Sequence, residues 1–330
     1  MKLRRLGNDG VEIGEIGLGC WSFAGAYGPT DQVESHRTLA RALELGIDFL
    51  DTANVYGNGV SEEVIGAFIR DHPGRFKIAT KGGIHRPPET NQRTFDNSPE
   101  HLREALEASL RRLGVEHVDL YYIHRREPAR PIEDVMATLV RFKEEGKIGG
   151  IGFSEISPTS LRRAHAVHPV TAVQSEYSLW TRQPDLGMVQ ATKALGVAFV
   201  PFSPLGRGIF STTAPEPGTF GPQDFRKNNP RFLEPYFSDN LEAIKPFKAM
   251  AADLRTTPAA LALAWALAQG SHLIPIPGTR SVEHLDELAA ATDLSLGADA
   301  LAEIDRILPP GFAFGHRYSD AQQVGAELYC

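Results

Sequence analysis

The segment I-D-F-L-D-T-A-N-V-Y (47–56) begins as a short apolar run and ends in polar residues. Such a run, placed directly after a glycine that stops a helical pattern, predicts a buried strand that ends at Asp51. Two later runs have the same form, F-K-I-A-T-K (76–81) and V-D-L-Y-Y-I-H (118–124). Because the C-terminal ends of parallel strands meet at one face of a (β/α)8 barrel, we expect the polar residues at these ends to converge.

These polar residues are a carboxylate, a phenol, an ammonium and an imidazole: Asp51, Tyr56, Lys81 and His124. A lysine that ends an apolar strand needs a partner, and Asp51 on the neighbouring strand is the natural one. A unit cation about 4 Å away favours the phenolate by more than burial disfavours it, so we expect Lys81 to lower the pKa of Tyr56. His124 would donate a hydrogen bond to a substrate oxygen. The set suits proton transfer to a carbonyl oxygen.

The rest of the chain repeats the alternation of strand and helix. The predicted strands are 15–19, 47–51, 76–81, 118–124, 148–153, 171–174, 197–202 and 272–276. The predicted helices are 31–45, 62–70, 99–113, 132–145, 158–167, 186–195, 241–254, 258–269, 281–291 and 297–306. This order favours an α/β fold, a (β/α)8 TIM barrel in a single domain over residues 1–330, with one of the last two helices in the outer ring. A doubly wound open sheet is the competing fold.

Three segments fall outside the alternation. The N-terminal L-R-R-L-G-N-D-G-V-E-I (3–13) predicts a β-hairpin, expected to plug the barrel floor. The connection after strand seven, from Ser203 to Ser238, is rich in Gly, Pro, Phe and Asn and has no sustained periodicity. A long loop leaving the catalytic mouth is typical of a lid over a ligand, with disorder as the alternative. The tail from Pro309 is expected to fold over the same mouth.

Composition excludes several functions. The formal net charge of −7, with no Lys/Arg run longer than a dipeptide, argues against a nucleic-acid partner. Cys20 and Cys330 lie far apart, so a disulfide framework is not expected and a reducing compartment fits better. There is no signal-peptide pattern and no long apolar stretch, so we expect a cytoplasmic protein with no membrane partner. No His-x-His or H-E-x-x-H spacing occurs, so no metal site is predicted.

Several stretches resemble the aldo-keto reductase superfamily: G-I-D-F-L-D-T-A-N-V-Y-G (46–57), I-A-T-K (78–81), D-L-Y-Y-I-H-R (119–125) and V-P-F-S-P-L-G-R-G (200–208). The resemblance runs from G-L-G-C-W (17–21) to I-P-I-P-G-T-R (274–280). It implies a barrel enzyme that uses NADPH to reduce aldehydes or ketones to alcohols. It also implies the roles of the four polar residues: Tyr56 as general acid, Lys81 lowering its pKa, Asp51 holding Lys81, and His124 positioning the carbonyl.

The resemblance further implies the contacts to the dinucleotide. Ser154 and Gln174 would hold the nicotinamide carboxamide, and Phe202 would stack on the nicotinamide ring. The residues that would line the pyrophosphate are Ser203, Leu205, Gly206 and Arg207. Those that would grip the adenosine 2′-phosphate are Gly278, Thr279 and Arg280, which favours NADPH over NADH. His284 and Glu287 match adenosine-side positions.

Two positions depart from the common family pattern. Glu155 stands where many members have Asn beside the nicotinamide, and Leu288 stands where Asn is common beside the adenine. The strings S-E-I-S (154–157), Q-S-E-Y-S-L-W-T-R (174–182) and D-F-R-K-N-N-P-R-F (224–232) resemble a branch that also has Ser-Glu at this point. That branch contains bacterial, yeast and plant reductases of the pyridoxal reductase and perakine reductase kind. Glu155 is therefore kept among the expected cofactor contacts.

The substrate pocket is expected among residues of the mouth-side loops: Trp21, Tyr27, Ile84, His85, Arg125 and Trp180. Two other functions are considered. One is a cofactor-binding regulatory subunit with little turnover. The other is a lyase with Lys81 as a Schiff-base nucleophile, which we disfavour because Asp51 would raise the pKa of that lysine. The sequence predicts a small carbonyl compound as substrate, but neither its identity nor the oligomeric state.

Overall fold

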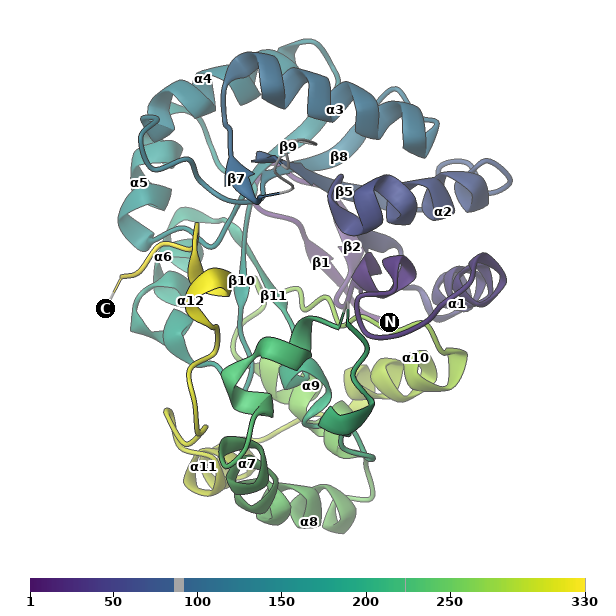
Figure 1. Ribbon diagram of the computed structural model, residues 1–330, viewed down its shortest axis with the longest axis vertical. Helices are drawn as coiled ribbons and strands as arrows, with labels where there is room; N and C mark the ends of the chain where they lie inside the picture. Colours follow the sequence, from purple (N-terminus) through teal and green to yellow (C-terminus); the bar gives the residue numbers. More distant parts are fainter. Residues whose placement is uncertain (86–91, 223, 330) are drawn as a thin grey trace.

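The computed structural model describes residues 1–85, 92–222 and 224–329. Seven strands form one parallel sheet in the order β11-β10-β9-β8-β5-β4-β3. Their bounds are β3 Leu18–Gly19, β4 Phe49–Asp51, β5 Lys77–Gly82, β8 Val118–Ile123, β9 Ile148–Ser154, β10 Ala172–Glu176 and β11 Ala198–Phe202. Helices surround this sheet in Figure 1. The predicted barrel architecture is confirmed.

The predicted eighth strand, 272–276, is not a regular strand. Leu273 and Ile276 form isolated parallel bridges to β11. On the other side, Gly17 N donates to Pro275 O at 2.9 Å and Gly19 N donates to Pro277 O at 3.0 Å, which closes the ring onto β3. Pro275 and Pro277 carry no N–H, so a regular ladder cannot form there. The first predicted strand, 15–19, is likewise shortened to two residues.

The N-terminal hairpin is present and plugs the barrel. Strands β1 (Leu3–Arg5) and β2 (Glu12–Gly14) pair antiparallel, as the sequence predicted. The hairpin side chains Leu6 and Ile13 are almost fully buried. They pack with inward-facing barrel residues in one apolar cluster, which includes Phe49, Ala79, Leu120, Ala172, Ala198 and Ile274.

Most predicted helices are found with small shifts at their ends. They are α1 Gln32–Leu45, α2 Val60–Ile69, α3 Pro99–Leu113, α4 Ile132–Glu144, α5 Pro158–Val167, α6 Met188–Leu195, α9 Pro258–Ala268, α10 Val282–Ala289 and α11 Ala298–Ile307. The Ser98 side chain caps α3 and the Ser157 side chain caps α5, with proline at the first helical position of each. Helix α10 packs against both α1 and α9, so it completes the outer ring.

The segment predicted as one helix over 241–254 is two helices, α7 (Tyr236–Ala243) and α8 (Lys245–Asp253). Pro246 occupies the first turn of α8 and cannot sit inside a continuous helix, so the chain breaks before it. In the described part of the loop from Ser203, four short 3-10 turns precede α7. The tail contains one short helix that the sequence pattern did not reveal, α12 (Asp320–Gln323).

Two short strands beside the mouth, β6 (Ile84–His85) and β7 (Thr94–Phe95), form an antiparallel pair. Cys20 is buried and not in a disulfide, and Cys330 lies outside the described residues. Within the described ranges, no helix is both long and apolar enough to cross a membrane. In the same part of the chain, no three His, Cys, Asp or Glu side chains are grouped to hold a metal ion.

Candidate active site

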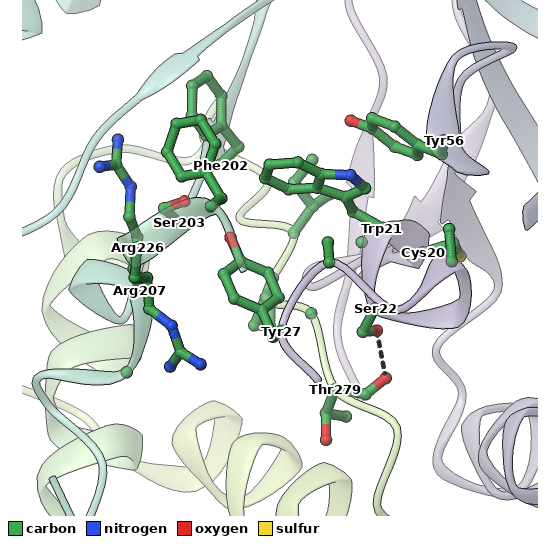
Figure 2. A pocket seen from close by; sticks show the side chains of 18 of the residues that line it. Cys20, Trp21, Ser22, Tyr27, Tyr56, Phe202, Ser203, Arg207, Arg226 and Thr279 are labelled. Carbon is green, nitrogen blue, oxygen red and sulfur yellow. Dashed lines mark hydrogen bonds between the residues drawn. The ribbon is translucent and has the colours of Figure 1, made fainter. Parts of the chain in front are cut away.

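A cavity of about 1360 Å³ opens at the C-terminal ends of the strands. Its walls come from strand ends, the loop after β11, the segment after Ile276, and the C-terminal tail. Figure 2 shows the rings of Trp21 and Tyr27 between Tyr56 on one side and Arg207 and Arg226 on the other. The cavity therefore has an end at Tyr56 and an end lined by arginines.

The structure brings the four polar strand-end residues together. Lys81 is fully buried and its Nζ contacts the Oδ1 atom of Asp51, which is also buried. The same Nζ donates to Thr52 O at 2.8 Å and lies 3.5 Å from the hydroxyl of Tyr56. The rings of Tyr56 and His124 meet edge to face with centroids 5.8 Å apart. Lys81 thus lies beneath the cavity, whereas the other three side chains line it.

The expected lowering of the pKa of Tyr56 is wrong for this state. Burial raises the pKa of the Tyr56 phenol well above its ordinary value, and the charge of Asp51 raises it further. The Lys81 ammonium, 3.5 Å from the hydroxyl, does not outweigh these two effects. Tyr56 therefore holds its proton throughout the physiological pH range.

Burial also governs Lys81, whose pKa is lowered although Asp51 acts in the opposite direction. The sequence argument against a Schiff-base lysine was right that Asp51 raises this pKa, but its expected net direction is wrong because burial outweighs Asp51. The geometry still disfavours that chemistry, because the Lys81 ammonium is enclosed beneath the cavity and bonded to Asp51 and Thr52.

His124 is a neutral imidazole in this environment. Burial lowers its pKa well below the ordinary value, and the nearby charges of Lys81 and Arg125 add to that effect. Its Nδ1 atom is buried and has no hydrogen-bond partner in the described part of the chain. A neutral ring can still donate one N–H bond, so His124 retains the capacity to position an oxygen atom.

The residues predicted around a nicotinamide lie mostly where the sequence placed them. Ser154, Gln174 and Phe202 line the cavity, with Phe202 beside Ser203 and Arg226 in Figure 2. The Gln174 amide donates to Asp51 Oδ2 at 2.7 Å, which ties β10 to the buried ion pair. Ser154 Oγ accepts a bond of 3.1 Å from Nη1 of Arg125.

Glu155 does not line the cavity, so the structure does not bring its side chain to the place where a cofactor contact was predicted. Its backbone is left-handed, with φ of 56°, and its carboxylate accepts from Glu176 N at 2.8 Å. The same carboxylate forms a buried ion pair with Arg317 of the tail. The side chain therefore holds the tail in place. The other departure, Leu288, does line the cavity.

At the expected pyrophosphate position, Ser203, Leu205 and Arg207 line the cavity. Gly206 does not, because it lies underneath them, where an added Cβ would meet Ile209 and Trp180. The Arg207 guanidinium is bound to Glu176 at 2.7 Å and stacks on two aromatic rings, Phe225 and Tyr318. Because its charge is already paired with Glu176, Arg207 contributes to the shape of the cavity wall rather than an unpaired cation for a ligand.

A further part of the cavity wall is formed after the irregular eighth strand. The residues predicted to grip the adenosine 2′-phosphate or the adenosine all line it: Gly278, Thr279, Arg280, His284 and Glu287. Ser22 Oγ donates to Thr279 O at 2.9 Å, as Figure 2 shows, and this bond fixes the segment against the turn after β3. Ser281 caps the N-terminus of α10 at the same place.

Four of the six residues expected in the substrate pocket line the cavity: Trp21, Tyr27, Ile84 and Arg125. Trp21 stacks on Tyr56 with ring centroids 5.6 Å apart. The structure does not bring His85 and Trp180 to the cavity surface. His85 packs edge to face on His101. Trp180 is buried, with its Nε1 donating to Asn240 at 3.2 Å.

Sequence reasoning missed the wall residues supplied by the long loop and the tail, chiefly Phe225, Arg226, Tyr318 and Gln322. Phe225 meets Trp21 edge to face at 5.3 Å, and Tyr318 meets Phe225 at 6.2 Å. These segments have no strand or helix periodicity. The available signal was their content of aromatic residues and arginine within loops already expected at the mouth.

Comparisons with known proteins agree with this geometry. The model of the family described as "Aldo/keto reductase family" matches residues 15–309. The chain belongs to the aldo/keto reductase family. This membership makes the protein an oxidoreductase, and the family resemblance of the sequence is confirmed.

Two relatives are similar over nearly their whole length. The chain is 38% identical to the NADP(+) aldo-keto reductase yakc of Schizosaccharomyces pombe, over 96% of this chain and 94% of that protein. It is 39% identical to probable aldo-keto reductase 1 of Glycine max, over 95% and 91%. Among solved structures, a glycerol dehydrogenase from Gluconobacter oxydans superposes with a TM-score of 0.84 at 29% identity, covering 93% of this chain and 94% of that one.

Proposed function

We propose that this member of the aldo/keto reductase family reduces an aldehyde or ketone to an alcohol with NADPH, with Tyr56 as the proton donor. General carbonyl reduction follows from the family. The observation that supports the assignment of Tyr56 is its hydroxyl at the cavity surface, 3.5 Å above a buried lysine that is itself held by Asp51.

The cavity fits a dinucleotide together with a small substrate. Its volume of about 1360 Å³ exceeds the roughly 300–1000 Å³ typical of a pocket for one drug-sized ligand. Arg280 at one end is suited to a phosphate, and Ser154 with Gln174 at the other end is suited to a carboxamide. Gly278 packs closely against the β3 backbone, because an added Cβ would lie 3.0 Å from Gly19 O. The related Schizosaccharomyces pombe protein is named for NADP(+), which supports NADPH here.

The side chains divide the proton chemistry among them. Bound NADPH supplies a hydride to the carbonyl carbon. The carbonyl oxygen then takes the proton of the Tyr56 hydroxyl, and the phenolate left behind is stabilised by the Lys81 ammonium 3.5 Å away. Asp51 keeps that ammonium in position, and neutral His124 donates a hydrogen bond to the same oxygen. Because Tyr56 holds its proton firmly, the transfer requires negative charge to develop on the substrate oxygen.

The test is a panel of aldehydes and ketones assayed separately with NADPH and NADH at steady state. We expect continuous oxidation of NADPH with activated aldehydes and a higher kcat/KM with NADPH than with NADH. Oxidation that stops after a single turnover for every carbonyl would instead identify a cofactor-binding regulatory subunit. Equal use of NADH would contradict the assignment of Arg280 to a 2′-phosphate.

A further inference from the structure

Arg125 is a buried cation in the wall of the cavity at the Tyr56 end. Its residue is only 8% exposed. Nη1 donates to His124 O at 2.8 Å and to Ser154 Oγ at 3.1 Å, which are both uncharged oxygens. Its Nε atom has no hydrogen-bond partner in the part of the chain that the structure describes. Within residues 1–85, 92–222 and 224–329, no carboxylate lies within 4.0 Å of this guanidinium.

The carboxylates of this region are already paired with other cations. Asp51 is held by Lys81, Glu155 by Arg317, and Glu176 by Arg207 and Arg317. These ion pairs leave Arg125 without a carboxylate in direct contact among the described residues, although its charge acts at longer range on Glu155. Its charge reaches the reacting end of the cavity, because it acts to lower the pKa of Tyr56 and of Tyr318.

Another buried arginine shows how the chain normally satisfies such a group. Arg231 has no carboxylate partner among the described residues either, but its nitrogens donate to Gly315 O, Trp180 O and Thr181 Oγ1. Three oxygens thus enclose that guanidinium, which serves the packing of the long loop. Arg125 instead keeps unused donor capacity and has no carboxylate in direct contact, and both are costly for a buried guanidinium unless a ligand uses them.

We propose that Arg125 binds an acidic group of the substrate, so that the preferred substrates are aldehydes or ketones that also carry a carboxylate. The inference rests on the proposed carbonyl reduction. A guanidinium presents a planar fork of donors that matches the two oxygens of a carboxylate. Arg125 follows His124 directly in the chain, so its charge lies beside the groups assigned to the carbonyl oxygen. The acid and the carbonyl therefore belong to the same small molecule.

The nearest alternative is that Arg125 acts through Ser154 and only orients the nicotinamide. The two roles differ in what they discriminate. A carboxylate site affects acidic substrates alone, whereas a nicotinamide-orienting residue affects acidic and neutral substrates equally and weakens NADPH binding.

The experiment compares three acidic aldehydes with their neutral methyl esters: glyoxylate, succinic semialdehyde and 4-carboxybenzaldehyde. Each pair is assayed with NADPH for the wild-type protein, Arg125→Gln and Arg125→Lys. The matched control is Arg126→Gln, which removes the same charge one residue later from a side chain bound to Glu327 outside the cavity. NADPH binding is measured for every variant by fluorescence titration.

We expect the wild type to favour the acid in at least one pair, mainly through a lower KM. In Arg125→Gln this preference should fall by about 10- to 100-fold, the effect of losing a hydrogen bond to a charged group. Arg125→Lys should restore part of it, and Arg126→Gln should leave the acid-to-ester ratio unchanged. An equal ratio in wild type and Arg125→Gln, or a parallel loss for acids and esters with weaker NADPH binding, would overturn the proposal.

Two further outcomes are distinguished from failure of the carboxylate site. If the wild type reduces no carbonyl at all, the proposed function itself fails. If Arg125→Gln does not fold, inhibition of the wild type decides: benzoate should compete with the aldehyde substrate and benzamide should not. Equal inhibition by the two would contradict a carboxylate site.

Discussion

At the scale of single residues, the Tyr56 hydroxyl is the group on which the proposed reaction depends. Tyr56→Phe keeps the ring that stacks on Trp21 and removes only the proton donor. We expect kcat to fall by about 10²- to 10⁴-fold, the usual contribution of a positioned general acid. NADPH affinity, measured by fluorescence titration, should change little. Unchanged turnover would remove Tyr56 from the mechanism.

The same residues lead to an expectation for the pH dependence. The pKa of Tyr56 is raised above its ordinary value, so the donor stays protonated as pH rises through neutrality. The pKa of His124 is lowered, so this ring stays neutral as pH falls towards 6. The value of kcat/KM for reduction should therefore be flat between about pH 6 and 8, because neither side chain gains or loses a proton in that range. A step near the ordinary histidine pKa that disappears in His124→Ala would contradict this.

Residue identities at strand ends were predictable, but their electrostatics were not. The strand periodicity alone placed Asp51, Lys81 and His124 at one mouth. The direction of the pKa shift at Tyr56 depends on burial and on how completely Asp51 offsets Lys81, and both are set by the folded environment. The Glu155 side chain lies away from the cavity because it pairs with Arg317, which is 162 positions away in the chain.

At the scale of elements, the tail is held over the cavity by the buried pair of Glu155 and Arg317. Glu155→Gln removes this pair, and we expect a loss of about 3 kcal/mol at neutral pH, typical of a broken buried pair. The pKa of Glu155 is lowered in the folded protein, so its stabilisation is present above the pKa of the unfolded chain and is lost as pH falls through the folded value. The difference in Tm between wild type and Glu155→Gln should therefore shrink as the pH is lowered from 6 to about 3.

Glu133→Gln is the matched control for this measurement. Glu133 pairs with Arg163, and both side chains are exposed on the surface. Solvent screens such a pair, so the substitution should leave the Tm almost unchanged. A Tm difference for Glu155→Gln that stays constant across the pH range would show that the pair with Arg317 does not carry the effect.

Elements with a strong period were predictable from sequence, whereas those set by single prolines or by tertiary contact were not. Ser98 with Pro99 marked the start of α3 correctly. Pro246 divides the segment predicted as one helix, and Pro275 prevents a regular eighth strand. The wall residues Phe225 and Tyr318 come from segments without periodicity, so only the fold brings them to the cavity.

At the scale of the whole molecule, the prediction that residues 1–330 form one domain implies a single cooperative unfolding transition. Because the proposed cofactor bridges wall segments from both ends of the chain, NADPH should raise the Tm of the entire transition. At about 100 times its Kd, a ligand adds about 2.7 kcal/mol of stability. Scanning calorimetry with and without NADPH would test this, and two separate transitions would contradict the single domain.

The contact between β3 and the irregular eighth strand, which contains Pro275 and Pro277, has a consequence for local opening of the barrel. We call this contact the seam. Across the seam, the backbone amides of Gly17 and Gly19 donate hydrogen bonds to the carbonyl oxygens of Pro275 and Pro277. A strand contact with few backbone hydrogen bonds opens locally at a lower free-energy cost than a full ladder. Amide hydrogen–deuterium exchange should therefore be faster at Gly17 and Gly19 than in the central strands. The residues after the seam, Gly278 to Arg280, line the cavity. A ligand bound there would therefore stabilise the strand contact of the barrel that opens at the lowest free-energy cost.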